Sequence, residues 1–344
     1  MPLSLYVDGP RWRDHLTATV AAQPGLVPVA KGNGYGFGVG RLARRAEWLG
    51  ASMTAVGTYR EVAEVDRRFS GDIMVLEPWR PLLTDVPYGQ RIIHTIGRAA
   101  DLAALADQAE RPRVVLEALT SMRRHGLAQD ELSALSRLAT NRRAAPGVRL
   151  EGQALHLPLG TGHVAEVERW LSAVPARRWF VSHLGADELT ALRAAHPGIE
   201  FRPRVGTALW LGDRRHLSAR ATVVDVHRVR RGERVAYRQR AVTRDGSLLV
   251  VAGGTAHGIA LEAPAAAASA RQRAVALARG GLDAAGRALS PYVVDGKQRW
   301  FIEPPHMQVS MIFLPAGASV PAIGDEVDVR VRFTTTHFDR VIVT

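Results

Sequence analysis

The stretch Val27-Pro-Val-Ala-Lys31-Gly-Asn-Gly-Tyr35-Gly-Phe-Gly38 joins an apolar run to a glycine-rich loop and places one lysine at the junction. The chain has two lysines, Lys31 and Lys297, among 45 lysine and arginine residues, so arginine supplies almost all of its positive charge. An arginine stays protonated, whereas a desolvated amine near other cations can lose its proton and attack a carbonyl group. Lys31 is therefore a candidate for Schiff-base chemistry, and the alternative is a solvated lysine in a glycine turn.

The apolar pattern around this stretch predicts an α/β barrel. Between about residues 11 and 215, short apolar runs alternate with Ala-, Leu- and Arg-rich segments of helical length, as in repeated β-α units. Strands are expected at Gly25–Ala30, Ser52–Val56, Asp72–Leu76, Arg91–Ile93, Val114–Glu117, Leu150–Leu155, Trp179–His183 and Phe201–Arg204. Eight such strands predict a (β/α)8 TIM-like barrel, in which reactive residues lie at the carboxyl ends of the strands. Lys31 follows the first strand at that end.

The pattern changes after Gly212 to runs dense in valine and charged residues. These runs predict a C-terminal β domain. Its strands are expected at Ala221–Arg230, Arg234–Tyr237, Leu248–Ala252, Val309–Leu314 and Glu326–Phe333. We expect the barrel over residues 9–216 and the β domain over residues 217–344, with a strand in residues 1–8 able to join the β domain. The Ala-rich stretch Ala263–Ala278 is either a helix or a mobile insertion.

Composition narrows the class of protein. The 344 residues suffice for a large and a smaller domain, and the absence of cysteine excludes disulfides and thiolate metal sites. We expect no metal. The start of the chain has no basic segment followed by a long apolar run, so a soluble, cytoplasmic protein without membrane insertion is expected. The net charge of +12 comes from scattered arginines without interleaved aromatic residues, so no nucleic-acid partner is expected.

The Lys31 stretch resembles the cofactor-lysine segment of alanine racemases, in which an apolar strand ends in Lys-Ala-Asn-Ala-Tyr-Gly-His-Gly. The two alanines of that pattern are Gly32 and Gly34 here, and its histidine is Phe37. The lysine, the asparagine, the tyrosine and both glycines keep their spacing. The resemblance implies that Lys31 forms the internal aldimine with pyridoxal 5′-phosphate (PLP) and that Tyr35 helps to hold the phosphate.

A second stretch, Glu117-Ala-Leu-Thr-Ser-Met-Arg-Arg124-His-Gly126, is similar to the racemase pattern Lys-x-Asp-Thr-Gly-Met-x-Arg-x-Gly. The resemblance implies that Arg124 meets the substrate carboxylate and the phenolic oxygen of the cofactor; the alternative is a surface arginine before a helix. Glu117 replaces a family lysine that is often carbamylated to become an anion. We therefore expect the Glu117 carboxylate to hold Arg124 through a charge-assisted hydrogen bond.

Three further matches follow along the barrel. The resemblance implies that His156 stacks on the pyridine ring; the alternative is a core residue, because a lone histidine in an apolar strand is often buried. A looser match implies that Ser182 contacts the phosphate, and the alternative is a serine that only ends its strand. The stretch Phe201-Arg-Pro-Arg204-Val-Gly206-Thr207-Ala-Leu-Trp-Leu-Gly212 looks like Arg-Pro-Gly-Ile-x-Leu-Tyr-Gly. It implies that Arg204 faces the pyridine nitrogen and that Gly206 and Thr207 contact the phosphate. Because arginine only donates hydrogen bonds, that nitrogen stays unprotonated, which favours proton transfer at Cα.

The resemblance weakens in the β domain. The family takes its second acid/base from a partner-subunit tyrosine in Gly-Tyr-Ala-Asp-Gly, whereas this chain has Gly253-Gly-Thr255-Ala-His257-Gly258. His257 is the candidate replacement, because its pKa range suits proton exchange near neutral pH; the alternative is a turn histidine without a role. Tyr237 and His306 are the next candidates. A further match implies that Met311 borders the substrate site.

These features predict a PLP-dependent amino-acid racemase or epimerase, an isomerase that differs from a standard alanine racemase and works as a head-to-tail homodimer. Its substrate would be an amino acid other than alanine. Two alternatives stay open. One is a PLP-dependent decarboxylase or lyase on the same scaffold, because loss of the tyrosine leaves the lysine linkage intact. The other is a PLP-binding protein without turnover, with a regulatory or assembly role.

Overall fold

The computed structural model describes residues 1–140, 147–261, 270–284 and 288–344. The chain divides into two compact units. The barrel unit comprises Arg13–Gly34 and Gly38–Gly212, and the β unit comprises Met1–Trp12, Tyr35–Phe37 and Asp213–Thr344. The short segment Tyr35–Phe37 thus groups with the β unit, although it lies in the sequence between two parts of the barrel unit.

The barrel unit is built on a sheet of eight parallel strands, in the order β2-β9-β8-β7-β6-β5-β4-β3. A parallel bridge between Val29 and Ala55 joins β2 to β3, so the two edges of the sheet meet. The predicted barrel is confirmed. The strands are β2 (Val27–Pro28), β3 (Met53–Val56), β4 (Asp72–Pro78), β5 (Ile92–Ile96), β6 (Arg113–Glu117), β7 (Arg149–His156), β8 (Arg178–Ser182) and β9 (Glu200–Val205).

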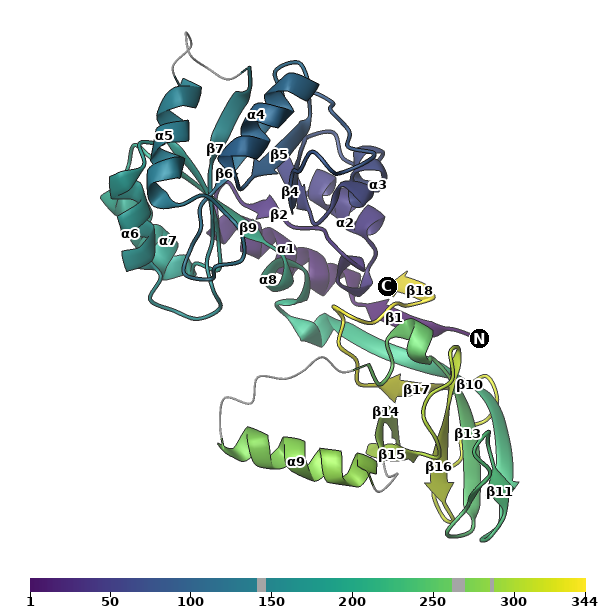
Figure 1. The fold of residues 1–344 in the computed structure, drawn as a ribbon. Helices are drawn as coiled ribbons and strands as arrows, with labels where there is room; N and C mark the ends of the chain where they lie inside the picture. Colours follow the sequence, from purple (N-terminus) through teal and green to yellow (C-terminus); the bar gives the residue numbers. More distant parts are fainter. Residues whose placement is uncertain (141–146, 262–269, 285–287) are drawn as a thin grey trace. The chain divides into compact units, whose positions relative to one another are not determined.

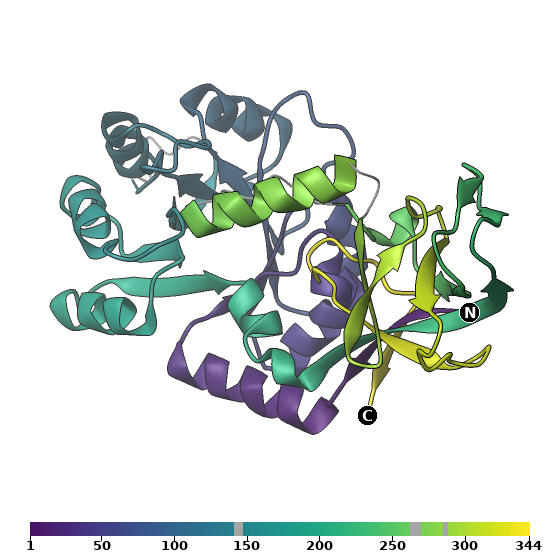
Figure 2. The ribbon, with the colours of Figure 1, turned by 90° about the horizontal axis from the view of Figure 1, so that it is seen from below.

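Helices follow most of these strands, and Figures 1 and 2 show α4 to α7 on the outer side of the barrel strands. Residues 79–91, between β4 and β5, form turns instead of a helix. The helix α1 (Gly9–Ala22) precedes β2. The others are α2 (Val39–Trp48), α3 (Val62–Asp66), α4 (Ala99–Gln108), α5 (Gln129–Thr140), α6 (Val164–Ala173), α7 (Ala186–Ala195) and α8 (Thr207–Leu211).

Alternation along the strands determines which residues reach the carboxyl end of the barrel. Strand residues two positions apart point to the same face of a sheet. The inward apolar cluster contains Val27, Val29, Met53, Ala55, Met74, Ile93, Val115, Ala154 and Phe180. Counting two residues onward from the last apolar residue of a strand gives polar side chains on the same face, at the carboxyl end. This step reaches Lys31, Glu117, His156 and Ser182, and it reaches Gly57, which has no side chain, just after β3.

The β unit is an eight-stranded sheet in the order β13-β16-β15-β14-β17-β10-β1-β18, and β10 also pairs with β13, which closes a ring of strands. Its core includes Leu3, Tyr292 and Ile312, all fully buried. The predicted β domain is confirmed. The strands of this sheet are β1 (Leu3–Val7), β10 (Leu217–Val229), β13 (Gly246–Ala252), β14 (Leu289–Val294), β15 (Lys297–Phe301), β16 (Val309–Pro315), β17 (Glu326–Val329) and β18 (Arg340–Val343). A separate two-stranded sheet contains β11 (Arg234–Val235) and β12 (Arg240–Ala241).

Several details of the β unit differ from the sequence prediction. The hairpin of β14 and β15 was not predicted, and β11 ends at Val235 because the chain turns at Ala236, which has a φ of 64°. Of the Ala-rich stretch, the part from Ala270 onward forms α9 (Ala270–Ala284), and residues 262–269 lie outside the described residues. None of the helices that the structure describes is long and apolar enough to cross a membrane.

Candidate active site

Lys31 follows β2 and begins a tight loop in which position 34 must be glycine. The Gly34 N–H donates to the Lys31 carbonyl oxygen at 3.0 Å, and the Gly38 N–H donates to the Asn33 carbonyl oxygen at 3.2 Å. Gly34 has a φ of 62°, and a Cβ atom there would lie 2.5 Å from the Val39 backbone nitrogen. Both the left-handed conformation and the lack of space therefore require glycine at this position.

A carboxylate that the sequence analysis missed holds this loop. Glu61 Oε1 accepts from the Gly32 N–H at 2.7 Å, while its Oε2 accepts from the N–H groups of Gly57 and Thr58 at 2.6 and 3.2 Å. Glu61 ends the short helix η2 (Tyr59–Glu61), which follows β3. The three amide groups belong to the ends of two neighbouring strands, so this carboxylate ties the lysine loop to the end of β3. Its position three residues after Thr58 was the only signal in the sequence.

The surroundings of Lys31 favour a neutral amine. Desolvation lowers the pKa of Lys31, and the positive charges of Arg124 and Arg204 lower it further, while Glu61 acts in the opposite direction. The side chain nevertheless reaches solvent, because Lys31 is an exposed residue. An accessible amine with a lowered pKa is what attack on a carbonyl group requires. The structure therefore brings Lys31, Arg124 and Arg204 within electrostatic range of one another.

Arg204 lies inside the barrel, where it contacts three neighbouring strands. Its Nε donates to Ser182 Oγ at 3.1 Å and its Nη2 donates to the Leu155 carbonyl oxygen at 3.1 Å. Its Nη1 lies 3.4 Å from Glu117 Oε2, and the side chains of this pair are 1% and 2% exposed. The guanidinium group is therefore fixed in place and paired with a buried carboxylate.

This pairing corrects the prediction for Glu117. Among the described residues, the Glu117 carboxylate forms its ion pair with Arg204, so the expected pairing with Arg124 is wrong. The physical reason is alternation: Glu117 ends β6 on the inner face, and the inward Arg204 of β9 reaches it. Arg124 lies instead on the loop that follows β6, where its Nε donates to His125 Nε2 at 3.0 Å.

The loop carrying Arg124 is fixed at several points. Thr120 Oγ1 donates to the His156 carbonyl oxygen at 2.6 Å, and Ser121 donates from both its N–H and its hydroxyl to Glu166 of α6, at 2.7 and 2.6 Å. Gly126 has a φ of 137°, and a Cβ atom there would lie 2.4 Å from the Ala118 carbonyl carbon. These contacts hold Arg124 at the carboxyl end of the barrel.

His156 ends β7 beside a second histidine. The rings of His156 and His183 lie 5.1 Å apart between centroids, edge to face at 66°. Burial lowers the pKa of His156 far below its usual value, and the charges of Arg204, Arg124 and Lys31 contribute to the shift. The imidazole of His156 is therefore neutral at physiological pH. His183 Nδ1 donates to the Leu157 carbonyl oxygen at 2.7 Å.

The remaining predicted cofactor residues lie in two places. Gly206 and Thr207 stand at the start of α8, just beyond the carboxyl end of β9, and Thr207 is exposed. Tyr35 belongs to the β unit, where it is buried at a φ of 55°. In the same segment the Phe37 ring stacks on Trp12, with centroids 4.6 Å apart and planes inclined by 4°.

In the β unit, the loop Gly253–Gly258 engages both ring nitrogens of His257. The Gly254 N–H donates to His257 Nδ1 at 3.2 Å, so the proton of the neutral ring lies on Nε2, which is 3.2 Å from Asp339 Oδ1. His257 is buried, at 7% exposure. The loop packs closely on residues 306 and 307, since a Cβ atom on Gly254 would lie 2.1 Å from the His306 carbonyl oxygen.

Another histidine beside this loop is more open. His306 Nε2 lies 2.5 Å from Glu303 Oε1, and the carbonyl oxygen of His306 accepts from the Thr255 N–H at 2.9 Å. Glu303 is buried, whereas the His306 side chain is 25% exposed. Within the part of the chain that the structure describes, His306 Nδ1 has no hydrogen-bond partner. Tyr237 is 84% exposed, and the centroid of its ring lies 4.6 Å from that of the His306 ring.

Met311 lies in β16, opposite Val250 of β13. Its side chain is partly buried and packs against the smaller apolar core of the β unit. That core contains Val229, Val235, Val242, Leu248 and Phe313.

Comparison with known proteins decides the family. The family model described as "Alanine racemase, N-terminal domain" matches residues 13–199, which is more than half of the chain. The chain belongs to the alanine racemase family. The match covers Lys31, Arg124, His156 and Ser182, and it ends just before β9.

Alignments with individual proteins cover more of the chain than the family model does. A curated alanine racemase from Nitratidesulfovibrio vulgaris is 29% identical over 272 residues, covering 69% of each chain. The structure of alanine racemase from Bartonella henselae with covalently bound pyridoxal phosphate has a TM-score of 0.71, with 15% identity and 100% coverage of both chains. A histidine racemase from Leuconostoc mesenteroides subsp. sake has a TM-score of 0.69, with 17% identity and coverage of 99% and 98%. At these identities the two structures show the fold alone.

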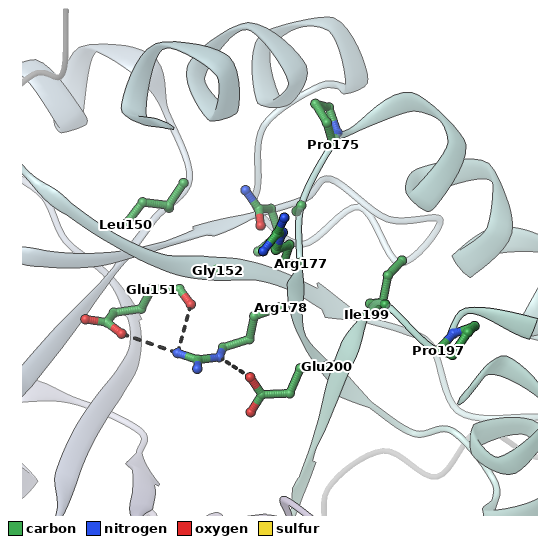
Figure 3. Close-up of a pocket in the computed structure, with 12 residues that line it drawn as sticks. Leu150, Glu151, Gly152, Pro175, Arg177, Arg178, Pro197, Ile199 and Glu200 are labelled. Atoms are coloured by element: carbon green, nitrogen blue, oxygen red, sulfur yellow. Dashed lines mark hydrogen bonds and ion pairs between the residues drawn. The ribbon is translucent and has the colours of Figure 1, made fainter. Parts of the chain in front are cut away.

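One cavity of this family member lies away from the candidate active-site residues. It has a volume of about 860 Å³ and is lined by the amino ends of β7, β8 and β9 and by the loops before β8 and β9. Figure 3 shows Arg178 in this region, directed toward Glu200 and Glu151. Since Lys31 and Arg204 lie at the other ends of the strands, this cavity is not part of the candidate active site.

Proposed function

We propose that this chain is a PLP-dependent amino-acid racemase in which Lys31 carries the cofactor. The observation that carries the proposal is the accessible Lys31 amine, whose pKa is lowered by desolvation and by Arg124 and Arg204 at the carboxyl end of the barrel. Membership of the alanine racemase family supports it, as does the similar fold of the Bartonella henselae enzyme with covalently bound pyridoxal phosphate.

The residues at this end of the barrel fit an anionic cofactor that bears a carbonyl group. Arg204 has five N–H donors and gives three of them to protein acceptors, so two remain for a ring nitrogen. A Cβ atom on Gly57 would lie 3.0 Å from Lys31 Cβ, so this glycine preserves the space beside the lysine. We assign the phosphate to Ser182, Gly206 and Thr207 of the barrel unit, and the role of Tyr35, which groups with the β unit, stays a prediction of the sequence.

When bound, PLP supplies a carbonyl group for attachment and an electron-withdrawing ring that makes the Cα–H of an amino acid acidic. The chain supplies the rest. The exposed guanidinium of Arg124 binds the carboxylate of the amino acid, and the neutral ring of His156 offers a flat face without adding positive charge. The Lys31 amine takes a proton from one face of Cα or returns one to it.

Racemization needs a second acid/base for the opposite face, and we place this group in the β unit of a second copy in a homodimer. The sequence predicts His257, but both ring nitrogens of His257 are engaged within the β unit. His306 fits the role better, because Glu303 holds its Nε2 and leaves Nδ1 open beside the Thr255 loop. A carboxylate that holds one ring nitrogen of a histidine in this way fixes the orientation and tautomer of the ring.

The attachment site can be tested directly. Borohydride reduction of the PLP-loaded protein, followed by peptide mapping, should place the label on Lys31, with Lys297 as the only other lysine in the chain. A label on Lys297, or no label after reconstitution, would contradict the proposal.

The reaction and its substrate need a second measurement. We propose an amino acid other than alanine, and incubation of an amino-acid panel that includes alanine and histidine in deuterated water should give Cα exchange with inversion. Carbon dioxide release instead would identify a decarboxylase. Labelled Lys31 without any exchange would identify a PLP-binding protein without turnover.

The two histidines can be separated by a matched pair of variants. His306→Asn should lower racemization by about 10²- to 10⁴-fold, the usual contribution of one acid/base group. It should also leave Cα exchange for one enantiomer, while His257→Asn should mainly weaken the loop. The reverse result would return the role to His257.

A further inference from the structure

The seam between β2 and β3 is the place where the barrel closes and where Lys31 leaves the strand. Few backbone contacts hold it: the Val29 bridge to Ala55, and the Ala30 N–H, which donates to the Ala55 carbonyl oxygen at 2.8 Å. Beyond these contacts the two chain segments separate into their loops. The next connection is the carboxylate of Glu61, which accepts amide groups from both segments.

We propose that Glu61 is a positioning residue for Lys31: its carboxylate locks the lysine loop to the end of β3 and places a negative charge beside the amine. The inference deepens the proposed function and rests on it for the role of Lys31. Charge-assisted hydrogen bonds to backbone N–H groups are strong, and Glu61 makes three of them, at 2.7, 2.6 and 3.2 Å.

The space around the two side chains supports a direct relation between them. A Cβ atom on Gly57 would lie 3.0 Å from Lys31 Cβ and 3.2 Å from Glu61 Oε2. The lysine stem and the carboxylate therefore both lie close to Gly57. A side chain at position 57 would have to displace one of them, so glycine is what lets the loop and the carboxylate meet.

Charge gives Glu61 a second effect. The groups that face the amine are Arg124 from the loop after β6, Arg204 from β9, neutral His156 from β7 and Glu61 from η2. The two arginines lower the pKa of Lys31 and Glu61 raises it. Glu61 thus limits how far the arginines depress the proton affinity of the amine, which keeps Lys31 able both to release and to accept a proton.

Pulse acylation of the full chain, freed of cofactor by hydroxylamine, tests this proposal. An amine acylating reagent is applied at a series of pH values, and peptide mass spectrometry compares Lys31 with Lys297 in the same sample. Glu61→Gln should move the midpoint of Lys31 acylation to lower pH by about 0.5 to 1 unit. The profile of Lys297 should stay unchanged.

Two variants separate charge from position. Glu61→Asp keeps the charge on a shorter side chain, so the midpoint should stay near that of the wild type while the loop loosens. Glu64→Gln is the matched control, because Glu64 Oε1 accepts from the Gly40 N–H at 3.1 Å in the adjacent helices and does not affect Lys31. An unchanged midpoint in Glu61→Gln, or an equal shift in Glu64→Gln, would overturn the proposal.

Hydrogen exchange of the wild type keeps the test independent of variants that fail to fold. The Gly32 amide should exchange slowly at neutral pH, because Glu61 accepts its proton. Rapid exchange of this amide in the folded protein would also overturn the proposal. None of these measurements uses the cofactor. A failure to label Lys31 with PLP would therefore contradict the proposed function and leave the result for Glu61 unaffected.

Discussion

The two ends of the barrel strands differ in how many of their cationic side chains have a carboxylate partner. At the amino end, Arg113 pairs with Asp72 at 2.5 Å and with Glu151 at 2.7 Å, while Arg178 pairs with Glu200 at 2.6 Å. At the carboxyl end, Lys31 and Arg124 have no carboxylate within ion-pair distance in the described part of the chain. The arginines named at the amino end are thus compensated, whereas of the three cations at the carboxyl end Arg204 is paired, with Glu117, and Lys31 and Arg124 are not.

The pairing of charges distinguishes the structural end of the barrel from the candidate active site better than cavity volume does. The cavity of about 860 Å³ lies at the amino end of the strands, where the residues of such barrels contribute stability rather than chemistry. The pKa of Lys31 is lowered first by desolvation and then by the charges of Arg124 and Arg204, and all three causes act at the carboxyl end. The same strands therefore carry paired charges at their amino ends and the candidate active site at their carboxyl ends.

The largest expected effect is at Lys31. Lys31→Ala should abolish the borohydride label and lower Cα exchange by about 10³-fold or more, because the residue both holds the cofactor and moves the proton. Lys297→Ala is the control and should keep label and exchange, since Lys297 lies in β15 of the β unit. Full exchange activity in Lys31→Ala would remove the distinction between the two ends of the barrel.

At the amino end the expected effect is on stability alone. Arg113→Met should lower the free energy of unfolding by about 3 kcal/mol, because Glu151, with a side chain 6% exposed, loses its buried partner. Arg149→Met is the matched control: it contacts the same carboxylate at 2.9 Å, but its side chain is 60% exposed, so its loss should cost less than about 1 kcal/mol. Urea unfolding measures both values. Equal losses would show that burial does not determine the value of these pairs.

The sequence predicts the strands of this barrel well because each has its own apolar run between helical segments. It also places Lys31, His156 and Arg204 at strand ends. It does not predict that Glu117 meets Arg204, because the two residues are far apart in the chain and only barrel closure brings β6 and β9 to face each other. The contact of Glu61 was missed for the same reason, since its partner Gly32 lies in the loop that follows a different strand, β2.

A third prediction concerns a buried group between the two ends. His94 Nδ1 of β5 lies 2.9 Å from the Tyr59 hydroxyl oxygen, and burial lowers the pKa of His94 from 6.5 to about 4. The unfolded chain therefore binds this proton more readily between pH 6.5 and 4, and stability falls as the pH drops through that window. The loss should approach about 3 kcal/mol.

Urea unfolding at pH 7 and pH 4.5 measures this loss. His94→Gln keeps an acceptor for Tyr59 and removes the titration, so the variant should lose less stability than the wild type on acidification. An identical loss in both proteins would assign the acid sensitivity to other groups.

The smallest expected effect is at the wall of the cavity. Arg178 lies 2.6 Å from Glu200 and 3.5 Å from Glu151, but its side chain is 37% exposed and that of Glu200 is 49% exposed. Exposed pairs of this kind contribute about 0 to 1 kcal/mol, so Arg178→Gln should change the urea midpoint little and less still at high salt. If the amino end is scaffold only, the acylation profile of Lys31 should be the same in this variant as in the wild type. A shift in that profile would mean that charge at the cavity reaches the lysine through the barrel, and the two ends would then have to be treated as one electrostatic system.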